Sequence, residues 1–165
     1  MLLDQKRYRV EARPALIVEK TFDILSMDGA PLGVAMNGVI HEREVPLITL
    51  HGKLFGHKTK VTFQDRNIGT LNLPVIADAD GFEIATLVVD DRNTQFQLIG
   101  VDGSKLAEVI REWGGFVKET IGTENSYEVS ITPAGEARPD MAALLVATVL
   151  KIDDVYPRDV PRLGQ

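Results

Sequence analysis

Apolar and polar residues alternate in short runs over most of the chain, and this alternation predicts β-strands. The clearest run is Ser126–Ile131, in which Tyr127, Val129 and Ile131 alternate with polar residues. A period of two places the apolar side chains on one face of a strand and the polar side chains on the other. Shorter runs of the same kind precede this segment, so the pattern favours a mainly β protein.

Turn dipeptides separate these runs. The clearest are Asp28-Gly29, Asn37-Gly38, Asp80-Gly81 and Asp102-Gly103. Residues of these types tolerate the positive φ angles of tight hairpin turns, which makes them strong local signals for a β-hairpin. We therefore expect consecutive strands to pair as antiparallel hairpins.

Two of the predicted hairpins share a sequence pattern. Phe22–Leu32 matches Phe96–Leu106, which lies 74 residues later. Each segment begins with Phe and has an aliphatic residue two positions after it, Asp-Gly six and seven positions after it, and Leu ten positions after it. A weaker version occupies Phe63–Leu71. The spacing predicts a strand, a tight turn and a returning strand in each copy, and it favours internal duplication of a β-meander.

The segment Ser104–Trp113 has the composition of a helix, but its apolar residues also fit a strand that leaves the Asp102-Gly103 turn. Its counterpart in the other copy contains Pro31 and Gly33, which are poor helix residues. The repeat therefore favours a strand for this segment.

One uninterrupted apolar run, Met141–Leu150, lies near the C-terminal end of the sequence. A membrane-spanning helix needs about 20 such residues, and this run has about half of that number. A helix that is apolar on every face must be surrounded by other parts of a protein. We therefore predict a helix over 139–152 inside a β shell, with side chains filling the interior so that no ligand cavity remains there.

Composition narrows the class of protein. The chain has 165 residues, which suits one domain over 1–157 with 158–165 as an extended tail. It contains no cysteine, which excludes disulfides and thiolate metal sites. The first residues lack the apolar stretch of a secretory signal, so the expected location is the cytoplasm.

The net charge of -6 is unevenly distributed. Residues 1–75 contain 10 Lys and Arg against 8 Asp and Glu, whereas residues 76–165 contain 8 against 16. An acidic protein has no general electrostatic attraction to nucleic acid, so nucleic acid is not an expected partner.

Candidate catalytic and metal-binding residues are sparse. His41, His51 and His57 are spaced by ten and six residues, unlike the closer spacing of zinc ligands. The acidic pairs Asp90-Asp91 and Asp153-Asp154 fit a turn and the exit of the helix into solvent. The sequence has no Gly-rich phosphate loop and no nucleophile motif, so we expect no enzyme activity, no cofactor and no metal.

The one concentrated basic segment is His51–Lys60. Its lysines, Lys53, Lys58 and Lys60, are candidates for binding an anion or an anionic lipid headgroup. Each is worth about 1 kcal/mol near an anionic membrane surface. The alternative is a solvated hairpin whose lysines keep a sheet edge soluble.

The chain resembles the tubby C-terminal-like superfamily in the order of its motifs. These motifs are Phe22–Gly29, Phe96–Gly103, Ser126–Ile131 and Asp140–Asp154. The resemblance covers 8–156 and extends to the plant LURP-one-related proteins and the phospholipid scramblases within that superfamily. It implies a mainly β (α+β) fold, an antiparallel closed β-barrel of about 12 strands around a central hydrophobic C-terminal helix.

Two departures from the scramblases limit what the resemblance implies. Scramblases carry an acidic calcium-binding segment beside the terminal helix and cysteine-rich palmitoylation sites. Here Thr132–Asp140 lacks alternating Asp ligands, and the chain has no cysteine. Tubby proteins bind phosphoinositide through surface Lys and Arg, but no motif of this chain carries those positions over.

These observations leave three hypotheses for function. The first is a non-enzymatic binding module that recognises an anionic phospholipid headgroup or another anion through Lys53, Lys58 and Lys60. The second is a protein-interaction scaffold that uses exposed strand edges or the acidic C-terminal half. The third is lipid translocation like that proposed for scramblases, which conflicts with a helix that already fills a barrel.

Overall fold

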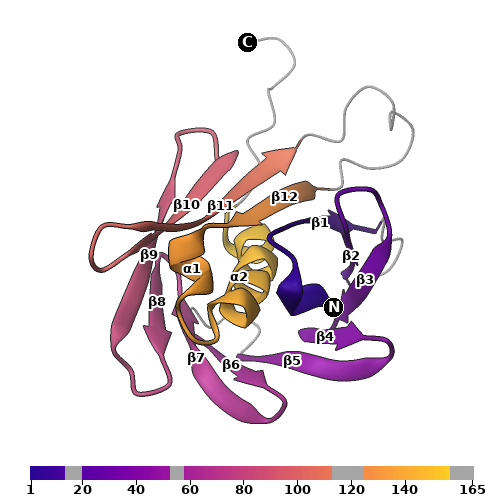
Figure 1. The fold of residues 1–165 in the computed structure, drawn as a ribbon, viewed down its shortest axis with the longest axis horizontal. Helices are drawn as coiled ribbons and strands as arrows, with labels where there is room; N and C mark the ends of the chain where they lie inside the picture. Colours follow the sequence, from indigo (N-terminus) through magenta and orange to yellow (C-terminus); the bar gives the residue numbers. More distant parts are fainter. Residues whose placement is uncertain (14–19, 53–57, 113–124, 157–165) are drawn as a thin grey trace.

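The fold is a β-barrel with a helix inside it. The structure is a computed structural model and describes residues 1–13, 20–52, 58–112 and 125–156. Within these residues, twelve antiparallel strands form a closed barrel, and a C-terminal helix runs through the middle of it (Figure 1). This confirms the mainly β class and the closed antiparallel barrel predicted from the sequence.

The strands are short and follow one another along the chain. They are β1 (Arg7–Ala12), β2 (Thr21–Leu25), β3 (Pro31–Met36), β4 (Val39–Glu42), β5 (Val45–Gly52), β6 (Thr59–Phe63), β7 (Arg66–Asn72), β8 (Val75–Asp78), β9 (Glu83–Val89), β10 (Gln95–Gly100), β11 (Lys105–Glu112) and β12 (Ser126–Ile131). The helical segments are the 3-10 helix η1 (Leu2–Asp4), α1 (Pro133–Glu136) and α2 (Met141–Val155).

Each strand pairs with the next one in the sequence, and β1 pairs with β12 to close the barrel. In that closing pair, Arg7 lies opposite Ser130 and Glu11 lies opposite Ser126. Closure leaves no unpaired strand edge among the described strands. The prediction that a protein partner uses exposed strand edges is therefore wrong, because a closed barrel has none to offer.

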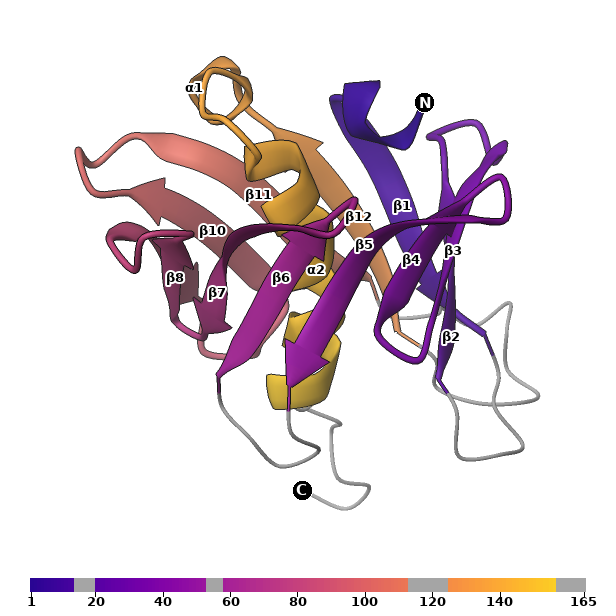
Figure 2. The same ribbon diagram turned by 90° about the horizontal axis from the view of Figure 1, so that it is seen from below.

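The two ends of the barrel differ. At the entry end, η1 and α1 lie beside the first turn of α2, and Leu2 is buried there with its amide donating to Glu42 Oε1 at 2.9 Å. At the exit end, the last turn of α2 emerges from the barrel (Figure 2). The short connections after β3, β7 and β9 also lie at the exit end.

Side chains bury α2 on all sides. Its buried residues are Met141, Ala143, Leu144, Leu145, Val146, Ala147, Thr148, Val149 and Ile152. The one polar member of this set, Thr148, donates its hydroxyl to the carbonyl oxygen of Leu144 at 2.7 Å, so its polar atom is satisfied within the helix. Apolar strand residues such as Ile24, Ile48 and Val129 complete a single core around the helix.

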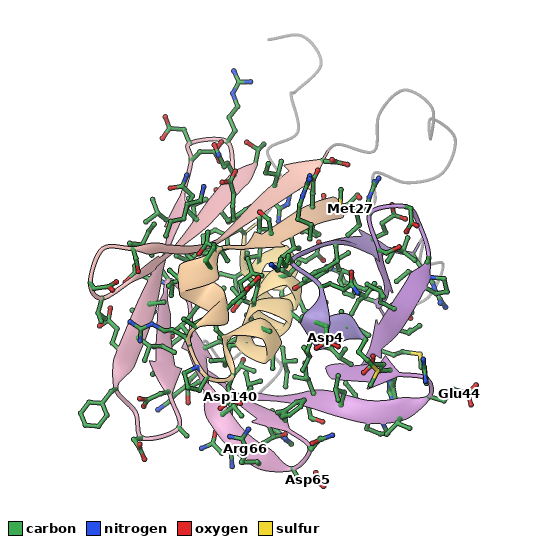
Figure 3. All side chains as sticks on the ribbon, in the orientation of Figure 1. Asp4, Met27, Glu44, Asp65, Arg66 and Asp140 are labelled. Carbon is green, nitrogen blue, oxygen red and sulfur yellow. The ribbon has the colours of Figure 1, made fainter. Side chains whose placement is uncertain are left out.

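The helix occupies 141–155 rather than the predicted 139–152. Its start is set by Asp140, which has a left-handed φ of 62° and so cannot continue a helix toward Pro139. The Asp140 carboxylate accepts two hydrogen bonds from Arg66, at 2.8 and 3.0 Å, and the two side chains face each other at the entry end (Figure 3). At the other end, Arg111 donates to the carbonyl oxygens of Ile152 and Tyr156.

The repeated sequence pattern corresponds to a repeated hairpin. In β2 and β3, Thr21 lies opposite Met36 and Leu25 opposite Pro31. In β10 and β11, the residues 74 positions later make the same pairs, Gln95 with Ile110 and Ile99 with Lys105. Both hairpins also shift register at the same place, one pair before the turn. Their aromatic and aliphatic residues point into the core, as predicted.

The weaker third copy, Phe63–Leu71, is not equivalent to the other two. Its turn falls at Gln64 and Asp65, directly after Phe63, and Gly69 lies inside β7 instead of in a turn. A Cβ at Gly69 would lie 2.5 Å from the carbonyl oxygen of Ala77, so this glycine permits close strand packing. The segment Ser104–Trp113 is largely the strand β11, which confirms the choice of strand over helix; Trp113 lies outside the described residues.

Candidate functional site

A cavity of about 590 Å³ opens at the exit end of the barrel. Its walls come from β2, β3, β5 and β6 on one side and from the last turns of α2 on the other. The apolar part of the lining includes Phe22, Ala35, Leu50 and Leu150. We refer to this space as the exit cavity.

The exit cavity lies at one open end of the barrel, beyond the interior that the sequence predicts to be filled. That prediction holds along the middle of α2, where the helix is fully enclosed. At the exit end, the small residues Ala35, Gly38, Gly52 and Thr59 line the cavity together with Leu150 and Lys151 of α2. These small residues belong to strand ends and to one turn.

Asp153 is the best-connected polar group of the cavity lining. Its side chain is only 4% exposed. Its carboxylate accepts hydrogen bonds from Tyr127 Oη at 2.6 Å, Asn125 Nδ2 at 2.8 Å and Lys20 Nζ at 2.9 Å. Burial raises the pKa of a carboxyl group, but these three donors outweigh burial and hold the pKa of Asp153 below its ordinary value.

A buried arginine supports this arrangement from inside the barrel. Arg111 donates from Nε and Nη2 to Tyr127 Oη, at 3.2 and 3.0 Å, and from Nη2 to the carbonyl oxygen of Tyr156 at 2.8 Å. Its guanidinium carbon lies 5.3 Å from the Tyr127 ring centroid and 5.4 Å from that of Phe96. The cation therefore fixes the exit of α2, and with it the position of Asp153.

Two further groups of the lining keep hydrogen-bonding capacity. Lys151 has a mostly buried side chain, 12% exposed, and its only ion-pair partner among the described residues is Asp154, with 3.5 Å between Nζ and Oδ2. Thr59 is 3% exposed, and its hydroxyl has no hydrogen-bond partner. Such buried, unpaired hydroxyls are uncommon in folded proteins.

The predicted basic residues lie close in sequence to residues of the cavity wall, and the two that the structure describes, Lys58 and Lys60, do not line it. Lys53 lies outside the described residues. Lys58 and Lys60 are exposed and have no ion-pair partner in the described part of the chain. Lys60 follows the buried Thr59 on β6 and therefore points to the outer wall, on the same face as its register partners His51 on β5 and Thr70 on β7.

Sequence reasoning missed the cations that do line the cavity, Lys20 and Lys151. Lys20 directly precedes β2, and nothing in its local sequence sets it apart. A signal did exist for Lys151, because it is the one basic residue of α2 and follows the apolar run directly. The expectation that both acidic residues after this run face solvent is right for Asp154, 65% exposed, and wrong for the buried Asp153.

The remaining candidate residues make local contacts. His51 lies 3.0 Å from the Thr62 hydroxyl on the outer wall, and Asp90 accepts bonds from the backbone amides of Thr94 and Gln95. His57 lies outside the described residues. Within the described ranges, no three histidine or acidic side chains gather as a metal site would require.

Comparison with known proteins adds no family to this description. No protein-family model matches the chain, and no curated protein or solved structure matches it significantly. The class of protein is therefore defined by its structure alone, as a closed antiparallel barrel around a helix with a cavity at one end. The resemblance to the tubby-like superfamily stays a prediction. Among the described helices, none has the length and hydropathy needed to cross a bilayer.

Proposed function

We propose that the protein is a non-enzymatic binding module that holds the anionic group of an amphiphilic ligand, such as a lipid headgroup, at the exit end of its barrel. The observation that supports this most directly is the exit cavity, where apolar walls and lysine side chains meet. Ligand sites are typically concave and mostly apolar, with a few polar groups that fix orientation. The proposal keeps the first of the three hypotheses drawn from the sequence, a non-enzymatic module that binds an anionic group.

The charges around the cavity favour a weak, salt-sensitive interaction. Lys20 and Lys151 share their charge with Asp153 and Asp154, so the cavity lining itself is close to neutral. Additional positive charge comes from the sequence next to the cavity wall, where Lys53 follows Gly52 and Lys58 precedes Thr59. Each lysine near an anionic surface contributes about 1 kcal/mol.

The cavity hydroxyl has no activating base among the described residues. Thr59 carries the only hydroxyl group of the described lining, and it has no hydrogen-bond partner. A nucleophilic hydroxyl needs an adjacent base within hydrogen-bonding distance. The described residues provide none for Thr59.

Vesicle co-sedimentation tests this proposal. We expect binding to phosphatidylcholine vesicles that contain phosphatidylserine, weaker binding at high salt, and little binding to phosphatidylcholine alone. Changing Lys53, Lys58 and Lys60 to Glu should weaken binding by at least about fivefold per lysine. The matched control changes three cations at the entry end, Lys6, Lys105 and Arg138, to Glu. Equal binding by the wild type and the triple variant would show that the basic segment is not the site.

A protein-interaction scaffold is the second candidate, and a groove on the outer wall favours it. This groove, of about 520 Å³, runs along β3 and β4 and is lined by Leu32, Val34, Met36 and His41. If it holds a protein, a stoichiometric partner from native lysate should be lost in Val34→Glu and kept in Met27→Glu. Loss of the partner in both variants, or in neither, would remove the groove as the reason to favour a scaffold.

A further inference from the structure

We infer that the exit cavity is a binding site for one acyl chain, with the anionic head of the same molecule at Lys20 and Lys151. This inference rests on the proposed function and specifies its ligand, a single-chain anionic amphiphile. The chemistry is shared by a free fatty carboxylate and by one chain of a membrane phospholipid. The experiment below separates these two sources.

The distribution of apolar and polar groups in the cavity matches such a molecule. Phe22, Ala35, Leu50 and Leu150 provide apolar surface, and the lysines stand at the end of α2, where it leaves the barrel. The volume of about 590 Å³ lies within the range of roughly 300–1,000 Å³ typical of small-molecule sites.

The two lysines of the cavity lining keep unused N–H donors, which can bind an acceptor on the ligand. The lining also contains Asn37 and the exposed Asp154. The Asp153 carboxylate is already occupied by three donors. Lys20 uses one of its three N–H groups on Asp153, and Lys151 has only the 3.5 Å contact to the exposed Asp154. A carboxylate or phosphate head would accept hydrogen bonds from both lysines without displacing Asp153 from Tyr127.

Thr59 supplies an independent observation. Its hydroxyl is buried in the cavity wall and unpaired, and a ligand oxygen would satisfy it. Gly52, on the neighbouring strand, leaves space beside this hydroxyl. A Cβ at position 52 would lie 3.0 Å from Thr59 Oγ1, so any larger residue there would crowd the hydroxyl.

The test is the affinity of the full-length protein for saturated fatty carboxylates from octanoate to palmitate, each used below its micelle concentration. Burial of the chain predicts that affinity rises about fourfold per added methylene until the cavity is filled. A head held only by surface lysines predicts no dependence on chain length. This series needs no variant, so its result does not depend on whether a variant folds.

Two variants place the chain and the head. Leu150→Trp fills the cavity and should abolish the dependence on chain length, whereas Val88→Trp, on the exposed outer wall of β9, should leave it unchanged. Thr59→Val removes the hydroxyl at nearly constant volume and should weaken carboxylate binding about fivefold to tenfold. Thr62→Val is its control, because the Thr62 hydroxyl contacts His51 on the outer wall.

The outcomes separate the two proposals. Binding to phosphatidylserine vesicles that is insensitive to Leu150→Trp, with no chain-length dependence in solution, overturns the acyl-chain site and leaves the binding module intact. Chain-length dependence with monomeric carboxylates supports the site and identifies free amphiphiles as a source. The same dependence seen only with chains presented in vesicles supports the site and identifies the membrane as the source. No binding to any anionic amphiphile overturns both proposals.

Discussion

At the residue scale, two buried charges at the exit end are stabilised in different ways. Asp153 is paired with a cation, Lys20, and with two neutral donors. Arg111 is 5% exposed, and its hydrogen-bond partners among the described residues are carbonyl and hydroxyl oxygens together with two aromatic rings. The carbonyls at the end of α2 carry the negative end of the helix dipole, which suits a cation at this place.

The lowered pKa of Asp153 predicts a loss of stability in acid. A carboxyl group with a pKa below its unfolded value of about 3.9 stabilises the fold above that value and ceases to do so as the pH falls through the folded pKa. The free energy of unfolding should therefore fall between about pH 5 and the folded pKa. Asp153→Asn, measured by urea unfolding across this range, should be less stable at pH 7 and less sensitive to acid. An equally steep acid loss in the variant would contradict this account.

At the element scale, the hairpins were predictable and their registers were not. Asp-Gly and Asn-Gly turns marked four of them, and the glycines at 29, 38, 81 and 103 all adopt positive φ angles. The register shifts before the turns of β2–β3 and β10–β11 depend on pairing across strands, which no single segment encodes. The short helix α1 was missed as well, although Thr132 caps it by accepting from the amide of Gly135 and Pro133 opens it.

The equivalence of the two repeated hairpins predicts equal responses to the same substitution. Gly29 and Gly103 have φ angles of 92° and 86°, and no heavy atom lies within 4 Å of a Cβ built on either. Gly29→Ala and Gly103→Ala should each cost about 1–2 kcal/mol from backbone strain alone. Urea unfolding measures both, and the corresponding Asn variants should recover part of the loss because Asn tolerates positive φ. A cost at only one of the two glycines would show that the hairpins are not equivalent.

At the scale of the whole molecule, the sequence predicted the barrel and its helix but not the exit cavity. The apolar run required an enclosure, and the hairpins provided one. The cavity brings together Lys20, Thr59 and Lys151 from distant parts of the chain. Small residues in its lining, such as Gly38 and Gly52, leave the space open. Local patterns do not report such empty space; they report concentrated charge, such as Lys53, Lys58 and Lys60.

The enclosure of α2 predicts a large difference between two leucine truncations. Leu145→Ala, at a residue 1% exposed in the centre of the helix, should cost about 2–5 kcal/mol because it leaves a cavity in the core. Leu25→Ala, at a half-buried position on β2, should cost less than about 1 kcal/mol. Urea unfolding midpoints measure the two costs. Similar losses at the two positions would mean that the helix does not form the centre of the core.

The position of α2 after all twelve strands has a consequence for biosynthesis. A ribosome releases the strands first, and the apolar helix that must occupy their interior follows only with residues 141–155. Until then the nascent sheet has no helix to pack against. The edge of β1 stays unpaired until β12 has been synthesised. Stalled or truncated products that end before Met141 would expose the apolar inner face of the sheet. We expect chaperones and proteases to bind such products.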